Sequence, residues 1–173
     1  MNETLRIAAF DIGTNKIVGA VSEKTEDSFS IIAIEEEKTR SGSVYKGKIN
    51  NVSDVAFQIV SIIRKLNNKI NAKINSAYIS ISNEKGYHTE EWDKLVKELG
   101  SRGVKVYTLD RLDCMADALM SNAEKEIGCL LIDFGAGCTS FILRNKKAPT
   151  FSGLLILFNF RKACCCNRLT NSS

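Results

Sequence analysis

The alternation of apolar and polar residues divides the first part of the chain into short strands. Residues 6–10 and 17–22 are apolar runs joined by a polar turn, and residues 28–34 form a third run after the polar segment EKTED. Short runs bounded by glycine, asparagine and charged residues are typical of β-strands. We therefore predict an antiparallel meander of three strands, followed by a loop or edge strand over the polar residues 35–48.

After Asn51 the pattern changes to the spacing of an amphipathic helix. Apolar residues recur at three- and four-residue intervals, at positions 52, 55, 56, 59, 60, 63, 66 and 70. This spacing predicts a helix with one buried face, and Ser53 is its predicted N-cap. Residues 77–82, AYISIS, then alternate as a half-buried strand does.

The second half of the chain alternates between helix and strand. Apolar residues from Trp92 to Leu99 predict a helix that Thr89 caps and Gly100 ends. A strand over 104–109, a helix over 112–123 and the buried strand CLLID after Gly128 follow it. Such alternation is typical of a β-α-β crossover, so the whole chain is predicted to be an α/β protein with a mixed sheet.

Two turns of similar composition interrupt these strands. FDIGTNKIVGA and LLIDFGAGCTSF each place an aspartate at the end of an apolar strand, then glycine, a hydroxyl side chain and a second strand. The residues that we single out in them are Asp11, Gly13, Thr14, Asn15 and Lys16 in the first turn, and Asp133, Gly135, Ala136, Gly137 and Thr139 in the second.

The chemistry of these turns points to phosphate. Glycine lets backbone N–H groups approach an anion closely, and threonine hydroxyls and a lysine ammonium add further donors. Because a carboxylate does not contact phosphate at low cost, Asp11 and Asp133 imply a cation between them, Mg²⁺ held partly through water. One such turn is often an ordinary hairpin. Two in matching strand contexts predict a clamp on the β and γ phosphates of a nucleotide.

Composition excludes several other classes of protein. The 173 residues are 44% hydrophobic and 25% charged with a net charge of +4, and the lysines alternate with glutamates instead of forming a basic stripe. We therefore expect no nucleic-acid partner. The six cysteines include no CxxC pair and there is a single histidine, His88, so a zinc site is not expected. Without a signal sequence or a long apolar run, the protein is predicted to be cytoplasmic.

The last part of the chain has a different pattern. Residues 151–160, FSGLLILFNF, are nearly all apolar, and RKACCCNRLTNSS follows without periodicity. One interpretation is a membrane-surface anchor with cysteines for acylation. The other is a disordered or out-of-frame end. The sequence leaves both open.

These motifs resemble those of the actin-like ATPases, and more specifically the bacterial cell-division family FtsA. DIGTNK is similar to the first phosphate motif of that superfamily, and IDFGAGCTS to the second. A GKI segment before a helix, SAYISIS and EKEIGCLLIDFGAGCTSF occur in the order found in FtsA. The likeness covers most of residues 5–150.

The resemblance implies a fold, ligands and partners. The fold would be subdomain 1A of an actin-like, ribonuclease H-like ATPase over residues 1–150, with a partial 1C insert at about 47–88 and a divergent tail over 151–173. The ligands would be ATP and Mg²⁺, with Asp117 positioning a catalytic water in what is at most a weak ATPase. The partners would be FtsZ and further copies of the chain, at the inner face of the cell membrane.

The departures from the family are also specific. FtsA proteins are well over twice this length, and the likeness is shortened internally between about Asn83 and Thr89 and lost after Gly153. The second motif has Ala136, Cys138 and Ser140 where the family has glycine, threonine and aspartate. Two alternatives remain: a sugar or acetate kinase of the same superfamily, and a degenerate fragment that binds no nucleotide. Without the C-terminal amphipathic helix of the family, membrane attachment is doubtful.

Overall fold

The larger layer of the protein is a five-stranded mixed sheet. The structure, a computed structural model, describes residues 5–25, 29–81, 90–134, 139–145 and 148–155. The strands lie in the order β3-β2-β1-β6-β7, and their bounds are Leu5–Ile12 (β1), Lys16–Lys24 (β2), Phe29–Lys38 (β3), Ser76–Ile81 (β6) and Lys105–Asp110 (β7). β1, β2 and β3 pair antiparallel, whereas β6 and β7 run parallel to β1. The predicted meander is confirmed. The predicted crossover from the strand over 104–109 to CLLID is wrong, because these two strands lie in different sheets. The parallel crossovers run instead from β1 to β6 and from β6 to β7.

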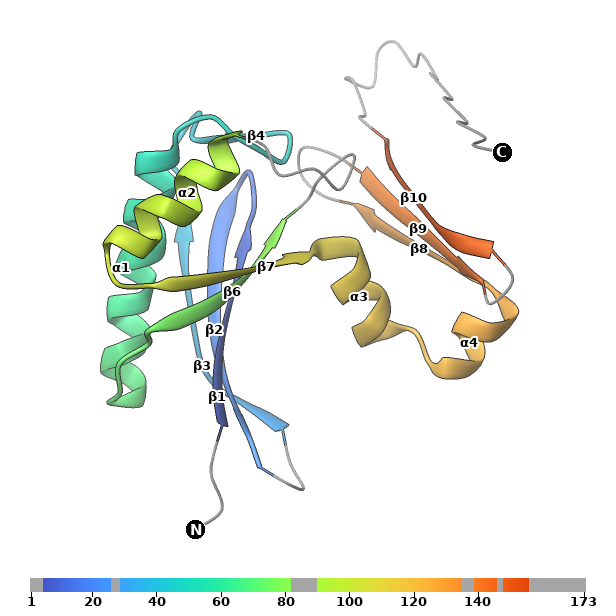
Figure 1. Ribbon diagram of the computed structural model, residues 1–173, viewed down its shortest axis with the longest axis horizontal. Coiled ribbons are helices and arrows are strands. Elements are labelled where there is room, and N and C mark those ends of the chain that lie inside the picture. The colour runs from blue at the N-terminus through green and yellow to red at the C-terminus, as the bar shows by residue number, and fades with distance from the viewer. Residues whose placement is uncertain (1–4, 26–28, 82–89, 135–138, 146–147, 156–173) are drawn as a thin grey trace.

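Two helices cover one face of this sheet, as Figure 1 shows. They are α1, Val52–Ile70, and α2, Glu90–Ser101. The apolar stripe of α1 predicted from its spacing is buried, and it packs with the inward side chains of the strands in a single core. Among the fully buried members are Ile17, Ile59, Leu66 and Ile79. Burying each such side chain contributes about 1.5–3 kcal/mol.

The N-cap of helix α1 is Asn51, two residues before the predicted cap Ser53. The backbone of Asn51 is extended, and its side-chain oxygen accepts a hydrogen bond from the N–H of Asp54 at 3.1 Å. Ser53 already lies within the helix. The prediction failed because either residue type can cap a helix, and only the backbone conformation decides between neighbours.

Gly19 on β2 lets α1 approach the sheet closely. A Cβ at this position would lie 2.6 Å from Cε1 of Phe10 and 2.7 Å from Cγ2 of Ile62. Carbon atoms do not pack at such distances, so any larger residue would push the helix from the strand. The glycine is therefore part of the core packing.

The region predicted as a loop or edge strand is partly regular. β3 continues to Lys38, where Glu35 and Glu37 form ion pairs with Lys69 and Lys65 of α1. A short hairpin, β4 (Val44–Tyr45) and β5 (Lys48–Ile49), precedes α1.

The segment expected to be an insert is integral to the sheet where the structure describes it. Residues 47–88 include α1 and β6. Helix α1 forms part of the main core, and β6 pairs with β1 on one side and with β7 on the other. Residues 82–89, which include Thr89, lie outside the described part of the chain. Strand order was not deducible from the local pattern, because a half-buried strand looks the same at the edge and at the centre of a sheet.

A separate three-stranded sheet follows, in the order β10-β9-β8. Its antiparallel strands are β8 (Cys129–Phe134), β9 (Thr139–Asn145) and β10 (Ala148–Leu155). The second Asp-Gly turn therefore belongs to a different sheet from the first. Strand β10 crosses the predicted boundary at residue 151, because Phe151–Leu155 pair with β9, and the division of the chain into domains stays a prediction. Residues 156–173, with their three adjacent cysteines, lie outside the described part.

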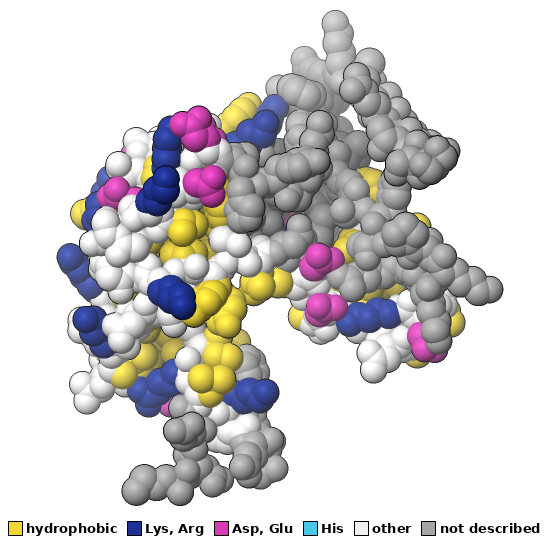
Figure 2. All heavy atoms as spheres, in the orientation of Figure 1, with side chains coloured by type: hydrophobic (Ala, Val, Ile, Leu, Met, Phe, Trp, Pro, Cys, Tyr) yellow, Lys and Arg dark blue, Asp and Glu magenta, His cyan; other side chains and the backbone are white. Residues whose placement is uncertain are grey.

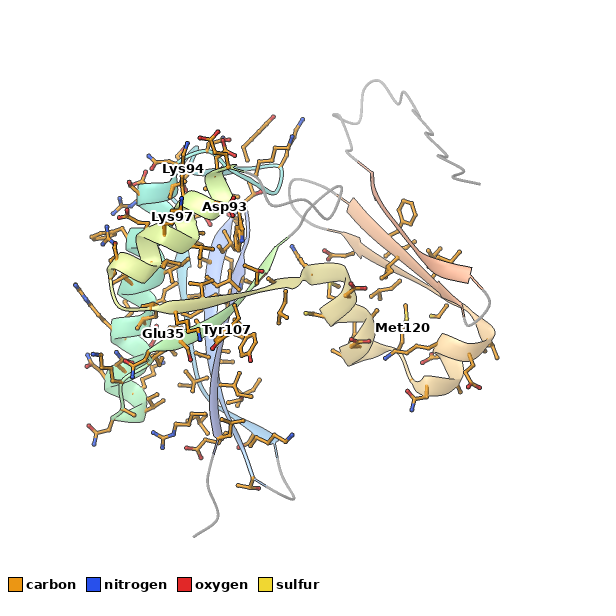
Figure 3. All side chains as sticks on the ribbon, in the orientation of Figure 1. Glu35, Asp93, Lys94, Lys97, Tyr107 and Met120 are labelled. Atoms are coloured by element: carbon orange, nitrogen blue, oxygen red, sulfur yellow. The ribbon has the colours of Figure 1, made fainter. Side chains whose placement is uncertain are left out.

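Two short helices connect the sheets, where one helix over 112–123 was predicted. They are α3, Arg111–Leu119, and α4, Asn122–Ile127. Ser121 interrupts the helix because its side chain and that of Glu124 form a reciprocal capping box at the start of α4. In Figure 1 α3 lies between the two sheets, and Figure 3 marks Met120 at its end. Met120 packs with Ala116 and Ile142 in a second, smaller core.

Candidate functional site

Asp11 lies on the face of the large sheet opposite to α1 and α2. Its neighbours Phe10 and Ile12 are buried in the main core, and successive side chains of a strand point to opposite faces. The Asp11 side chain is 48% exposed, and its Oδ1 accepts a hydrogen bond from Oγ of Ser80 at 3.3 Å. Both residues come from carboxyl ends of parallel strands, where α/β proteins commonly bind ligands.

The first turn is a tight connection between β1 and β2. The N–H of Gly13 donates to the carbonyl of Lys16 at 3.0 Å, and a Cβ at Gly13 would lie 2.8 Å from that same oxygen. Thr39 ties the turn to the end of β3, since its N–H donates to the Asn15 carbonyl at 2.9 Å and its hydroxyl to the Gly13 carbonyl at 2.8 Å. Gly13 thus shapes the turn and uses its own amide internally. The amides of Thr14 and Asn15 are at the tip.

Lys16, predicted to contact phosphate, forms an exposed ion pair. Its Nζ lies 2.6 Å from Oε2 of Glu36, and the two side chains are 55% and 58% exposed. Exposed pairs of this kind contribute little to stability, about 0–1 kcal/mol. Because Ile17 is buried in the core, Lys16 lies on the same face of the sheet as Asp11. An anion at that face would compete with Glu36 for the ammonium group.

Asp133 is on β8 of the smaller sheet, opposite Ser140 of β9, and its side chain is 18% exposed. Residues 135–138, with the predicted Gly135, Ala136 and Gly137, lie outside the described part of the chain. Thr139 begins β9, and its side chain is likewise not described. Their roles in binding phosphate stay predictions.

Arg111 brings the two aspartates together. Its Nη2 lies 3.0 Å from Oδ2 of Asp133, and its Nη1 lies 3.9 Å from Oδ1 of Asp11. The first distance is that of a charge-assisted hydrogen bond, and the second is that of an ion pair without one. Arg111 is the first residue of α3, directly after β7. Asp11 and Asp133, which come from separate sheets, therefore both face Arg111. Their predicted roles in holding a metal ion stay predictions.

The sequence reasoning missed Arg111. Its signal was weak: a basic residue at a strand-to-helix boundary, between two acidic residues in the run Leu109 to Asp113, LDRLD. Its importance depends on contacts with residues far away in the chain, which no local pattern shows.

Asp117, the predicted water-positioning residue, lies further along α3. Its carboxylate is 65% exposed, and its Oδ1 accepts a hydrogen bond from Nζ of Lys125 of α4 at 3.1 Å. At a rise of 1.5 Å per residue it is about 9 Å along the helix axis from Arg111. The pairing gives Asp117 a structural partner, and its catalytic role stays a prediction.

The donor set of the site suits a hydrated magnesium ion. Within the described residues, no three histidine, cysteine, aspartate or glutamate side chains meet at a metal-binding spacing. Asp11 and Asp133 would therefore supply at most two carboxylates, and water and phosphate would supply the rest. Mg²⁺ characteristically retains water in this way. The space between the carboxylates already accommodates a guanidinium group.

The open face of the large sheet is apolar next to this site. One row across all five strands consists of Ile34, Ala20, Ala9, Tyr78 and Tyr107. The rings of Tyr78 and Tyr107 stack with centroids 5.1 Å apart. Hydrophobic side chains gather over β6 and β7 in Figure 2, and Figure 3 labels Tyr107. In the described part of the chain, no helix is long and apolar enough to cross a membrane.

Solved structures share this fold. No family model and no curated protein matches the sequence. The ethanolamine utilization protein EutJ from Carboxydothermus hydrogenoformans matches 88% of this chain and 54% of its own, with 21% identity and a TM-score of 0.64. The PilM–PilN type IV pilus biogenesis complex matches 87% of this chain and 61% of its own, with 14% identity and a TM-score of 0.64.

The same fold occurs in MreB5 of Spiroplasma citri, solved with bound ADP, which matches 87% of this chain and 52% of its own with 15% identity and a TM-score of 0.60. The chain thus spans about half to three-fifths of the length of these structures. At such identities the likeness concerns the fold alone. The chain has the fold of the actin-like ATPases, as the resemblance of its motifs implied.

Proposed function

We propose that this chain is an FtsA-like, nucleotide-binding actin homologue that links FtsZ filaments to the membrane at the division septum. The observation that carries the nucleotide-binding part is the convergence of Asp11 and Asp133, from two sheets, on Arg111. A clamp around a polyphosphate requires that residues of the two turns lie close together, which is not expected of two unrelated hairpins. An ADP-bound structure with the same fold supports this reading.

In the proposed complex each turn has a defined task. Asp11 and Asp133 would hold Mg²⁺ through water, and its charge would offset that of the ATP phosphates. Phosphate oxygens would accept hydrogen bonds from the amides of Thr14 and Asn15 and from the ammonium of Lys16. Gly135, Gly137 and Thr139 are proposed to supply further donors. Hydrolysis would be slow, with Asp117 orienting water.

The role in division is supported by the order of the motifs and not by the site. FtsZ and further copies of the chain are the proposed partners, and the inner face of the cell membrane is the proposed location. A sugar or acetate kinase would use the same phosphate clamp but would also need a phosphoryl acceptor. Incubation with ATP and either a sugar or acetate would then yield a sugar phosphate or acetyl phosphate.

A thermal melt of the chain with and without Mg-ATP tests the nucleotide-binding part. A ligand at 100 times its Kd stabilises the folded state by about 2.7 kcal/mol, which is about 5–10 °C for a chain of this size. We expect such a shift with Mg-ATP and its loss in Asp11→Asn. Asp93→Asn, on the exposed side of α2, is the matched control and should respond like the wild type. A cooperative melt that Mg-ATP does not change would mean that the chain is a non-binding relative.

Co-sedimentation with FtsZ filaments tests the division part separately. We expect the chain to pellet with the filaments and to remain in solution without them. If it shifts its melting temperature with Mg-ATP but never pellets with FtsZ, the nucleotide site is retained and the assignment to division is wrong.

A further inference from the structure

We propose that Arg111 is a built-in counter-ion which takes the place of a divalent cation between Asp11 and Asp133 in the nucleotide-free chain. The inference rests on the proposed function in one respect: it takes these two aspartates as the pair that faces the metal. It adds a residue that neither turn contains and predicts how the site discriminates between metal alone and metal with nucleotide.

The first argument is geometric. The two terminal nitrogens of one guanidinium face two different carboxylates, at 3.0 Å from Asp133 and 3.9 Å from Asp11. Only arginine has a planar fork that can serve two acceptors at once, whereas lysine presents a single point charge. Ser80 helps to orient the Asp11 carboxylate, because its hydroxyl donates to the same Asp11 oxygen that faces Arg111.

The second argument is the position of Arg111 on its helix. A helix N-terminus carries a partial positive charge, so a cation in the first turn is electrostatically disfavoured. Arg111 is nevertheless the first residue of α3, and its side chain is only 24% exposed. The charges of the two aspartates offset this unfavourable placement, as does Asp113 in the same turn.

The third argument is a charge balance. Asp11 and Asp133 alone would form a site of charge −2 that attracts Mg²⁺, but with Arg111 between them the charge is −1. A free divalent ion must then displace the guanidinium and meet its repulsion. A nucleotide supplies additional negative charge that offsets both costs. Metal alone should therefore bind weakly, and metal together with nucleotide should bind well.

The test is Mn²⁺ binding to the full chain without nucleotide, measured as the loss of the free Mn²⁺ signal in electron paramagnetic resonance. Arg111→Gln removes the charge but keeps a polar side chain. Competing interactions of this kind typically change affinity 5–150-fold, so we expect binding on the order of tenfold tighter than in the wild type. Arg102→Gln is the control: Arg102 pairs with Glu98 on the surface, and its loss changes the net charge equally.

An unchanged Mn²⁺ affinity in Arg111→Gln, or an equal gain in Arg102→Gln, would overturn the proposal. If Arg111→Gln does not fold, Arg111→Met also removes the charge and keeps a long unbranched side chain, and its Mn²⁺ affinity must exceed that of the wild type. The outcome is separable from that of the Mg-ATP melt. Tighter Mn²⁺ binding without any nucleotide effect would support the counter-ion and refute nucleotide binding, and the reverse would refute only the counter-ion.

Discussion

The two sheets carry similar Asp-Gly turns but are stabilised very differently. The five-stranded sheet buries one face under α1 and α2 in a continuous core of aliphatic and aromatic side chains. In the three-stranded sheet, the described core comprises Ala116, Met120 and Ile142, with Cys129 and Leu131 packed against it. Asp11 therefore lies on a strand of the large core, whereas Asp133 lies on a strand whose described core is small.

The smaller sheet also has an apolar face that α3 does not cover. Leu131 and Ile142 are opposite each other and face the small core, whereas Leu130 and Leu143, the next pair, are 55% and 43% exposed. A two-faced apolar sheet needs a second layer for full stability. Asp11 and Asp133 therefore come from two strands of unequal support, one in a sheet with a large core and one in a sheet with a small core.

Truncating one core residue in each sheet should show the difference in stability between the two sheets most clearly. Ile59 and Ile142 are both buried, but Ile59 lies in the large core and Ile142 in the small one. We expect Ile59→Ala to reduce the free energy of unfolding of the whole chain by about 2–5 kcal/mol. Ile142→Ala should reduce the stability of the whole chain less, because only Ala116 and Met120 share its buried core, and it should increase amide exchange only in β8 and β9.

Urea unfolding and hydrogen exchange measure both effects. Equal losses of stability in the two variants, with exchange increased throughout the chain in both, would show that the two sheets unfold as one unit.

A smaller effect is expected where α1 meets the large sheet. Gly19→Ala places a methyl group within 2.6 Å of Phe10 and 2.7 Å of Ile62, and such overpacking typically costs about 1–3 kcal/mol. Gly100→Ala is the matched control, because a Cβ at Gly100 meets no atom within 4 Å. Since alanine favours helix, that variant of α2 should be unchanged or slightly more stable. Differential scanning calorimetry would compare them, and equal melting temperatures would refute the close packing at Gly19.

The smallest effect concerns pH and the contact between β3 and α1. Burial raises the pKa of Glu37, but hydrogen bonds from Lys65, Ser61 and Gln58 and the charge of Lys65 outweigh it, so the pKa is lowered below 4.5. The folded chain therefore binds this proton less readily than the unfolded chain, and the resulting stability is present above pH 4.5 and lost as the pH falls further.

We expect the urea midpoint of the wild type to fall more steeply between pH 5 and 3 than that of Glu37→Gln. Parallel curves for the two proteins would show that Glu37 does not contribute. Glu36→Gln is a suitable control, because Glu36 is exposed on the opposite face and pairs with Lys16.

The elements of this fold were predictable because each depends on residues close together in the sequence. The spacing of apolar residues identified α1 and α2, apolar runs joined by a polar turn identified β1 and β2, and alternation identified β6. The errors were also local: Asn51 replaced Ser53 as a cap, and Ser121 divided a predicted helix. Cap residues compete with their neighbours for the same N–H groups, and packing decides which is used.

The sequence by itself determined that both turns place an aspartate and a glycine after an apolar strand, which identified Asp11 and Asp133 as candidate site residues. It did not determine that the turns lie in separate sheets, that the Gly13 amide closes its own turn, or that Lys16 pairs with Glu36. Only the tertiary structure placed Arg111 between the aspartates. The reason is physical: periodicity records which side of an element is buried, whereas an ion pair between three distant segments exists only once strand order and helix packing have brought them together.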